Sequence, residues 1–468
     1  MKKLLRSMVD AHWMFIVIAL VFGLALMVIT PPLWGADEGV HFFRAYQLSN
    51  GEISQKQVSI DGKSSNAGSV PASFVRLNDI KAKGIADSAL GGKQAGNIGA
   101  YYSAARIPIT KDKSVANPYT KTIYSPIVYI APAAGIYIIH FFNPTAITML
   151  FSARIATLSL YILLVFLALY ILRKTVVKWT IFIIALLPMS LYQATVVSPD
   201  SLLLGLSLIF LAILYVTLYA KHRLGRKEIV LITLTTCLIT LIKMPYVILT
   251  LPLVLLPLPK SISSRKKVFV KFGIPLLCIM VALFSLISIR VGATSSSPGG
   301  IDLVGQLHVV VFHPAHYLYT LANSIVYLDW VPQIIGLFGS TFIFIPGIVI
   351  QLLLVSLVLT AFLETKKDNY DNAKVDKLSA TIFIGASLLT SLAIITTLYL
   401  TWTPVGANLV QGIQGRYFLP LIAFFLLGLR RLTRGRLFIS EKSAMIGYPL
   451  LAIVTLFTSL AWYYRILY

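Results

Sequence analysis

Residues 13–29 read WMFIVIALVFGLALMVI, and residues 31–52, almost directly after them, read PPLWGADEGVHFFRAYQLSNGE. The first stretch carries no charge and is long enough, as an α-helix, to cross the roughly 30 Å of hydrocarbon in a bilayer. The second places an Asp, a Glu, a His and an Arg close together where the apolar stretch ends. We therefore expect a membrane-spanning helix that delivers a polar cluster to one face of the membrane.

The composition of the whole chain agrees with a membrane protein. Of its 468 residues 57% are hydrophobic and only 12% are charged, and the mean hydropathy is +0.83, far from the values of soluble domains. Further charge-free apolar windows follow along the chain, whereas the alternating ten-residue segments of a β-barrel are not evident. The sequence therefore predicts an all-α integral membrane protein.

The formal net charge of +23 is distributed over short loops between apolar segments. This distribution is typical of the positive-inside rule for membrane orientation, so we expect no nucleic-acid partner. The N-terminal MKKLLRSMVDAHW resembles the start of a signal peptide, but no clear A-x-A cleavage site follows the apolar stretch. We expect an uncleaved first span in the cell membrane, with the N-terminus in the cytoplasm.

The same rule predicts a multi-pass topology of about eleven helices and a C-terminus on the outer side. Residues 122–142 decide on which side of the membrane the later loops lie. If this segment spans, the basic stretches at 221–227 and 259–267 lie outside; if it is re-entrant or interfacial, both lie inside. We prefer the re-entrant interpretation, because two prolines and several tyrosines also suit a broken, partly wet element. The expected spans are then 13–29, 150–172, 179–195, 200–220, 229–245, 246–259, 268–289, 340–362, 380–400, 417–430 and 444–463.

This topology makes residues 1–468 a single membrane domain with two extracytoplasmic elaborations. The first is the long loop at 33–149, which contains the re-entrant segment and interfacial helices. The second, at 291–339, contains FHPAHYLYTLANSIVYLDW and has an amphipathic pattern. No fixed-period repeat or large soluble domain stands out.

Nearly all unusual polar residues fall on the outer face in this topology, where ionisable groups near the membrane indicate function by default. We expect Asp37 and Glu38 to be catalytic and the other site residues to bind substrate, with the cations as candidates for binding an anion. The expected site residues are Asp37, Glu38, His41, Arg44, Tyr124, Arg154, Asp200, Lys243, Tyr246, Arg416 and Tyr417.

Each acidic residue also has a plain structural interpretation. Asp37 and Glu38 can favour the positive end of a helix that begins after Pro32, but the spacing of residues 37, 41 and 44 also puts three polar side chains on one helical face. We favour a functional face. For Asp200, an N-cap in SPDSLLLGL and a role in the site are equally good interpretations.

The cations have similar alternatives. Lys243 can extend to the interface, but its place before a proline in LITLIKMPYVILTLP also suits a cation at the mouth of a broken helix. Arg416 can be an interfacial anchor, but two glycines in QGIQGRYFLP suit a close backbone approach and a phosphate-binding guanidinium. We favour a functional role for both.

Metal binding is not favoured. His313 and His316 are three residues apart, but no third ligand stands near them in sequence. The two cysteines, Cys237 and Cys278, fall inside apolar spans and are interpreted as small buried hydrophobic residues. We expect no cofactor.

An outward pocket with carboxylates and cations suits an anionic, partly lipidic substrate. Arg44, Lys243 and Arg416 would neutralise a phosphate or pyrophosphate, grooves between spans would hold an isoprenoid tail, and a carboxylate would take the proton from an acceptor hydroxyl. This chemistry is that of a glycosyltransferase with a polyprenyl-phosphate sugar donor.

The sequence also resembles known families. An acidic pair in the first external loop of a polytopic protein is similar to the GT-C superfamily of glycosyltransferases, which use lipid-phosphate sugars outside the cytoplasm. Five motifs occur in order between residues 31 and 420: ADEGVHFFRAYQLSNGE, YSPIVY, PMSLYQATVVSPD, KMPY and QGIQGRYFLP. This finer pattern resembles a bacterial family of membrane proteins catalogued as a domain of unknown function and related to GT-C.

The resemblance implies a GT-C-like fold with Asp37 at the catalytic acidic position and Glu38 beside it. It implies a second acidic motif at Asp200, and donor phosphate near Lys243 and Arg416. The expected partners are a polyprenyl-phosphate sugar donor, a cell-surface glycan acceptor and membrane lipids. The chain lacks the large C-terminal soluble domain of oligosaccharyltransferases, which argues against protein glycosylation. A transporter or flippase for a lipid-linked glycan, and a non-catalytic assembly factor, are the alternatives.

Overall fold

The computed structural model of the chain describes most of its length. The described residues are 10–53, 56–60, 63–89, 102–103, 106–110, 112–116, 124–219, 224–258, 263–290, 301–340, 342–364, 376–432 and 437–468. The basic stretch at 221–223, the start of the loop at 291–300 and the residues at 122–123 lie outside this part.

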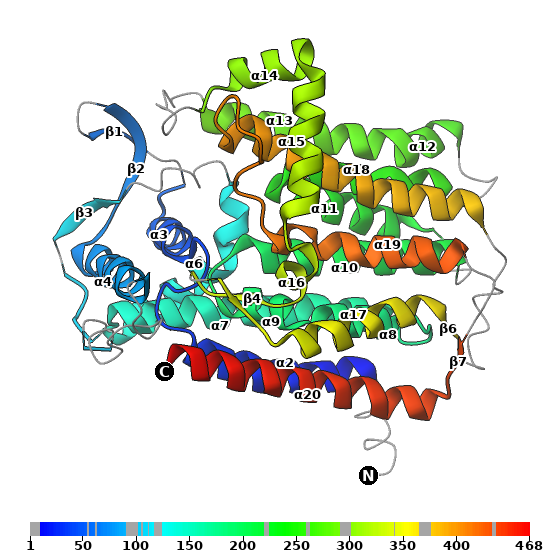
Figure 1. Cartoon of the computed structure of the whole chain (residues 1–468), viewed down its shortest axis with the longest axis horizontal. Coiled ribbons are helices and arrows are strands. Elements are labelled where there is room, and N and C mark those ends of the chain that lie inside the picture. Colours follow the sequence, from blue (N-terminus) through cyan, green and yellow to red (C-terminus); the bar gives the residue numbers. More distant parts are fainter. Residues whose placement is uncertain are drawn as a thin grey trace.

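Long apolar helices form the body of the molecule and run side by side along its long axis (Figure 1). Within the described residues, six of them have the length and hydropathy needed to cross a membrane, which makes the chain a multi-pass membrane protein. Among them α2 packs against α20, so the first and last of the described helices are neighbours. The six are α2 (Ala11–Ile29), α7 (Ala146–Ile171), α10 (Pro199–Tyr219), the stretch Ser264–Phe284, α18 (Lys377–Trp402) and α20 (Glu441–Leu467). The stretch Ser264–Phe284 consists of α12 (Ser264–Val268), the π-helical η4 (Phe269–Gly273) and the first part of α13 (Ile274–Arg290).

The expected number of eleven spans is not confirmed, because several expected spans are short or broken. The span at 179–195 consists of α8 (Lys178–Ala185) and α9 (Pro188–Thr195), which a proline at the start of α9 separates. The span at 246–259 is instead a 3₁₀ segment, η3 (Met244–Leu255). The helices α11 (Arg226–Ile242), α17 (Gly347–Phe362) and α19 (Leu419–Leu432) have 17, 16 and 14 residues.

The segment at 122–142 also forms a broken helix. Its described part consists of η1 (Pro126–Tyr129), α6 (Ile130–Ile139) and η2 (His140–Phe142). Ten residues of α-helix are only about 15 Å long, and α6 packs against α3 and α7. By length α6 alone does not cross a bilayer, and its position relative to the membrane stays a prediction.

One end of the bundle carries the polar elaboration expected after the first span. It contains α3 (Glu38–Ser49), α4 (Ala72–Ala89) and an antiparallel sheet in the order β1-β2-β3, at the left of Figure 1. The strands are β1 (Lys56–Ile60), β2 (Lys63–Pro71) and β3 (Lys113–Ala116).

The second elaboration contains α14 (Leu303–Phe312), α15 (Pro314–Tyr327) and α16 (Trp330–Ile335). In Figure 1, α15 runs across the direction of α18 and α19. After α16, strands β4 (Leu337–Phe338) and β5 (Ile343–Phe344) form a short antiparallel hairpin.

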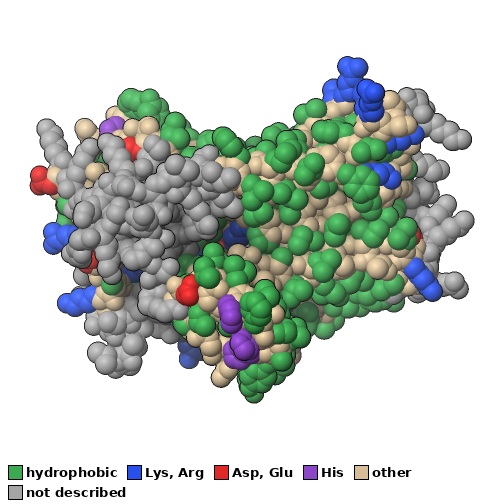
Figure 2. Space-filling model, turned by 90° about the horizontal axis from the view of Figure 1, so that it is seen from above, with side chains coloured by type: hydrophobic (Ala, Val, Ile, Leu, Met, Phe, Trp, Pro, Cys, Tyr) green, Lys and Arg blue, Asp and Glu red, His purple; other side chains and the backbone are tan. Residues whose placement is uncertain are grey.

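The opposite end of the bundle joins its helices through short contacts. Strand β6 (Leu363–Glu364) pairs in parallel with β7 (Leu437–Phe438), and Lys178 forms an ion pair with Glu441. Figure 2 shows one face of the molecule, where hydrophobic side chains cover the half formed by the long helices and Lys and Arg collect at its far right end. An apolar belt between polar ends is the surface that a bilayer requires.

Candidate functional site

The turn between α2 and α3 carries the acidic pair. Its backbone is left-handed at Leu33 and Asp37, with φ of 59° and 61°, a conformation that is costly for residues other than glycine. Asp37 is the residue that precedes α3 and is not part of the helix. Residues 37, 41 and 44 therefore do not share a face of α3 as expected, because Asp37 precedes the helix and its backbone is not helical.

Glu38 is a buried anchor of this turn. Both of its carboxylate oxygens lie 2.7 Å from guanidinium nitrogens of Arg154 on α7, and both side chains are 0% exposed. The backbone N–H groups of Gly35 and Val197 donate to the same carboxylate at 3.0 and 3.2 Å. Arg154 also donates to the carbonyls of Met27, Thr30 and Pro31.

These contacts join the ends of three helices. The Glu38–Arg154 pair connects the end of α2, the start of α3 and the segment after α9 in one closed network of charge-assisted hydrogen bonds. A carboxylate without exposed surface holds the backbone in place and has no access to a substrate. Glu38 thus acts on the site by fixing the turn that presents Asp37.

Asp37 pairs with a different arginine from Glu38, and its side chain is partly exposed. Its Oδ2 accepts a hydrogen bond from Nη2 of Arg416 at 3.1 Å, and its side chain is 35% exposed. Arg416 is only 3% exposed and also donates from Nη1 to the carbonyl of Ala36. The guanidinium therefore holds both the backbone and the carboxylate of the turn.

Asp200 joins the same cluster from the first turn of α10. Its Oδ1 lies 2.5 Å from Nζ of Lys243, and its Oδ2 lies 3.0 Å from Nε of Arg416. Arg416 thus bridges Asp37 and Asp200, which are far apart in sequence. Of the two interpretations left open for Asp200, its side chain takes the role in the charged cluster.

Tyr417 and Tyr246 also contact the cluster. The Nζ of Lys243 lies 3.8 Å from the centroid of the Tyr417 ring, in a cation–π arrangement. The hydroxyl of Tyr246 donates to the carbonyl of Tyr417. Lys243 stands at the junction of α11 and η3, so the predicted break in the helix is present and carries the cation.

Two further predicted residues, His41 on α3 and Tyr124, lie near the cluster. The Nδ1 of His41 lies 2.8 Å from the hydroxyl of Tyr129, and the His41 ring meets that of Tyr124 edge-on at 5.7 Å. Burial raises the pKa of Tyr124 well above its usual value, and the charge of Asp200 adds to this. Tyr124 is therefore a neutral hydroxyl close to the cluster.

Arg44 has a different role from the one predicted. Its guanidinium is buried and donates to the carbonyls of Glu52 and Ile53, at 2.9 and 2.5 Å. These bonds fix the chain that leaves α3. Arg44 therefore secures the C-terminal end of α3, as Arg154 secures its start, whereas Lys243 and Arg416 contact the carboxylates.

Lys81 on α4 is a residue that the sequence interpretation missed. It is partly buried, and the carboxylates of Glu38 and Asp37 both act on its charge. By residue type alone, Lys81 in RLNDIKAKGIAD does not stand out from the neighbouring Lys83. The signal that was available is helical spacing, because Phe74, Asn78 and Lys81 fall on one face.

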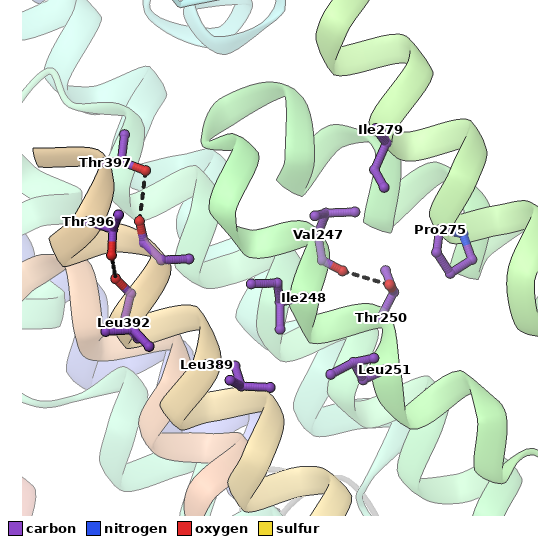
Figure 3. Close-up of a pocket in the computed structure, with 11 residues that line it drawn as sticks. Val247, Ile248, Thr250, Leu251, Pro275, Ile279, Leu389, Leu392, Thr396 and Thr397 are labelled. Atoms are coloured by element: carbon purple, nitrogen blue, oxygen red, sulfur yellow. Dashed lines mark hydrogen bonds between the residues drawn. The ribbon is translucent and has the colours of Figure 1, made fainter. Parts of the chain in front are cut away.

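An apolar groove with a volume of about 640 Å³ lies between η3, α13 (Ile274–Arg290) and α18. Figure 3 shows that its labelled residues come from these three elements. Val247, one of its lining residues on η3, directly follows Tyr246 of the charged cluster in the sequence. It is lined by Val247, Ile248, Thr250, Leu251, Pro275, Ile279, Leu389, Leu392, Ala393, Thr396 and Thr397.

The part of the chain that the structure describes holds no group of three His, Cys, Asp or Glu suited to a metal ion. His313 is the residue before α15 and His316 lies in its first turn. Cys237 and Cys278 are free thiols with their sulfur atoms 3.5 Å apart. Independence from metals and cofactors stays a prediction.

Comparison with known proteins gives the family. Residues 20–425, which include every residue of the charged cluster, match the family described as "Predicted membrane protein (DUF2142)". No curated protein and no solved structure matches the chain. Since the match covers most of the sequence and the helices agree with it, the chain belongs to the DUF2142 family of predicted membrane proteins.

Proposed function

We propose that this protein is a glycosyltransferase of the GT-C kind, which moves a sugar from a polyprenyl-phosphate donor to a cell-surface glycan acceptor. Asp37 is the general base. The N-terminus lies in the cytoplasm, and the site faces the outer side of the membrane.

The observation that carries the proposal is that η3 contributes both to the charged cluster, through Tyr246, and to the apolar groove, through Val247. Asp200, Lys243 and Arg416 form the charged part, and Val247, which lines the groove, lies four residues after Lys243. In a 3₁₀ helix four residues rise about 8 Å. A ligand that fits both features has an anionic head and a long hydrocarbon chain, which is the chemistry of a lipid phosphate.

The groove is suited to a chain that arrives from the bilayer. Three of its side chains, Leu251, Leu389 and Leu392, are exposed on the surface of the helical body. In a membrane such a surface faces lipid. A prenyl chain can therefore enter sideways and keep its apolar surface out of water, at about 25 cal/mol per Å².

Asp37 has the features of a base for an acceptor hydroxyl. It is partly exposed, its ion pair with Arg416 orients the carboxylate, and the Glu38–Arg154 network fixes its turn. The hydroxyl proton passes to the Asp37 carboxylate as the hydroxyl oxygen bonds to the anomeric carbon. The bond from that carbon to the phosphate oxygen breaks, and its electron pair leaves with the lipid phosphate.

The test is Asp37→Asn in a strain that lacks the native gene. Removing a general base typically costs 10²–10⁴-fold in rate, so we expect one sugar substituent to disappear from the surface glycan while the abundance of the protein stays unchanged. Asp79→Asn is the matched control, because Asp79 is an exposed carboxylate on α4. Unchanged glycan in a fully expressed Asp37→Asn strain would contradict the assignment.

A further inference from the structure

The packing of α4 on α3 carries Lys81 to the acidic turn. Phe74 of α4 contacts the rings of Phe42 and Tyr46, with centroids 4.8 and 4.9 Å apart. One turn further along α4, the Oδ1 of Asn78 lies 3.0 Å from the position that a Cβ would take at Gly39. Later residues of α4 thus contact earlier residues of α3.

The next residue on the same face of α4 is Lys81. Residues 74, 78 and 81 have the i, i+4, i+7 spacing of a single helical face, and their partners on α3 run backward from 46 through 42 to 39. The step after Gly39 reaches Glu38 and Asp37. Lys81 therefore lies beside the acidic turn, on the side of the polar elaboration.

The surroundings of Lys81 differ from those of the three cations that pair with carboxylates around the acidic turn. Arg154, Lys243 and Arg416 each pair with a carboxylate, whereas none of the ion pairs formed among the described residues includes Lys81. Burial lowers the pKa of Lys81, and the nearby charges of Glu38 and Asp37 oppose that effect. A partly desolvated ammonium without a paired carboxylate is costly unless a ligand supplies the counter-charge.

The charges of the cluster lead to the same conclusion. Asp37 and Asp200 carry two negative charges, and Lys243 and Arg416 carry two positive charges, so these four residues balance one another. Arg416 is already bound to Asp37, to Asp200 and to the Ala36 carbonyl. Lys81 would add one positive charge to these four residues when an anionic ligand enters.

We propose that Lys81 is the residue that binds the anionic group of the ligand, a phosphate ester, beside Asp37. This assignment rests on the proposed function, since it gives the phosphate of the lipid donor its own cation. The three cations of the site then have different roles. Arg416 positions the base, Lys243 pairs with Asp200, and Lys81 contacts the ligand. An ammonium suits this role because it binds phosphate as a point charge.

The experiment measures binding of two probes, farnesyl phosphate and inorganic phosphate, to the full-length protein in lipid nanodiscs. We expect Lys81→Gln to weaken binding of farnesyl phosphate by roughly tenfold or more, as loss of a charged hydrogen bond does. Lys81→Arg should keep most of the affinity. Lys83→Gln, an exposed lysine on the same helix, is the matched control and should bind as the wild type does.

A second measurement does not depend on a variant that folds. Bound farnesyl phosphate should protect the amine of Lys81, but not that of Lys83, from an amine-reactive reagent, as read by mass spectrometry of the wild-type protein. The Lys81 assignment is overturned if Lys81→Gln binds like the wild type, if Lys81 is not protected, or if the wild type binds neither probe. Phosphate alone bound in a Lys81-dependent way supports an anion site and argues against a lipid ligand.

This outcome is separate from that of the proposed function. The glycan phenotype of Asp37→Asn tests the transfer reaction without reference to Lys81. Loss of transfer in Asp37→Asn together with normal binding in Lys81→Gln would keep the glycosyltransferase and reject the role of Lys81.

Discussion

At the scale of the residue, two adjacent carboxylates have opposite environments. Asp37 is 35% exposed and Glu38 is fully buried. The difference arises because the left-handed backbone at Asp37 turns the chain between them. Adjacent acidic residues that look equivalent in sequence therefore divide into a reactive group and a structural one.

This division predicts different effects on stability. Glu38→Gln removes one charge from a buried ion pair and leaves Arg154 uncompensated, which typically costs about 3–5 kcal/mol. We expect a lower thermal unfolding temperature for Glu38→Gln in detergent, measured by the fraction of protein that stays monodisperse on heating. Asp37→Asn, which changes a partly exposed pair, is the control and should unfold near the wild-type temperature. Equal stability of Glu38→Gln and the wild type would contradict the structural role of Glu38.

The structure brings together four of the polar residues that stand out from apolar surroundings in the sequence. Asp200, Lys243, Arg416 and Asp37 come from four separate segments, and the structure brings them within ion-pair distance. Sequence alone does not distinguish a cation that contacts another side chain from one that binds backbone carbonyls, as Arg44 does. That distinction depends on loop paths that helical periodicity does not determine.

At the scale of the element, η5 (Gly415–Phe418) positions Arg416 by packing directly on α16. A Cβ at Gly415 would lie 2.3 Å from the backbone carbon of Gln333 and 2.5 Å from the backbone nitrogen of Ile334. Such contacts are too short for any side chain. The glycine expected from sequence to allow a close backbone approach has this function, although the approaching backbone belongs to the protein itself.

Gly415→Ala should therefore displace η5 and Arg416 together. We expect a loss of transfer activity in the surface-glycan assay and a drop in stability of roughly 1–3 kcal/mol, typical of overpacking. Gly385→Ala on α18 is the matched control, because no atom lies within 4 Å of its added Cβ and alanine favours helix. Full activity in Gly415→Ala would show that the contact with α16 does not position Arg416.

The groove gives a second prediction at this scale. Thr397 lines it, whereas Thr401, one turn along α18, does not, and both hydroxyls donate to their own helix at 2.7 Å. Thr397→Phe should fill the groove and so weaken binding of undecaprenyl phosphate far more than that of isopentenyl phosphate, because each methylene left unburied costs about 0.8 kcal/mol. Thr401→Phe is the control. An unchanged ratio of the two affinities in Thr397→Phe would mean that the prenyl chain binds elsewhere.

At the scale of the whole molecule, hydropathy identified the long helices and failed at the broken ones. The six helices that pass the length and hydropathy criteria were all expected as spans. Between residues 178 and 195 the apolar pattern is continuous, but Pro188 starts a new helix and divides the expected span into α8 and α9. Apolar content indicates that a segment avoids water. Whether the segment forms one unbroken helix depends on its local backbone geometry and on neighbours that bond the backbone groups left unpaired at a break.

The orientation of the bundle is the last prediction. Asn50 lies at the end of α3, and Lys227 lies at the start of α11; both are exposed. With Cys237 and Cys278 replaced by alanine, an impermeant thiol reagent should label Asn50→Cys in intact cells and Lys227→Cys only after permeabilisation. Labelling of Lys227→Cys in intact cells would put the basic loop outside, in conflict with the positive-inside rule. The segment at 122–142 would then cross the membrane, and with α6 only ten residues long the bilayer would have to thin around it.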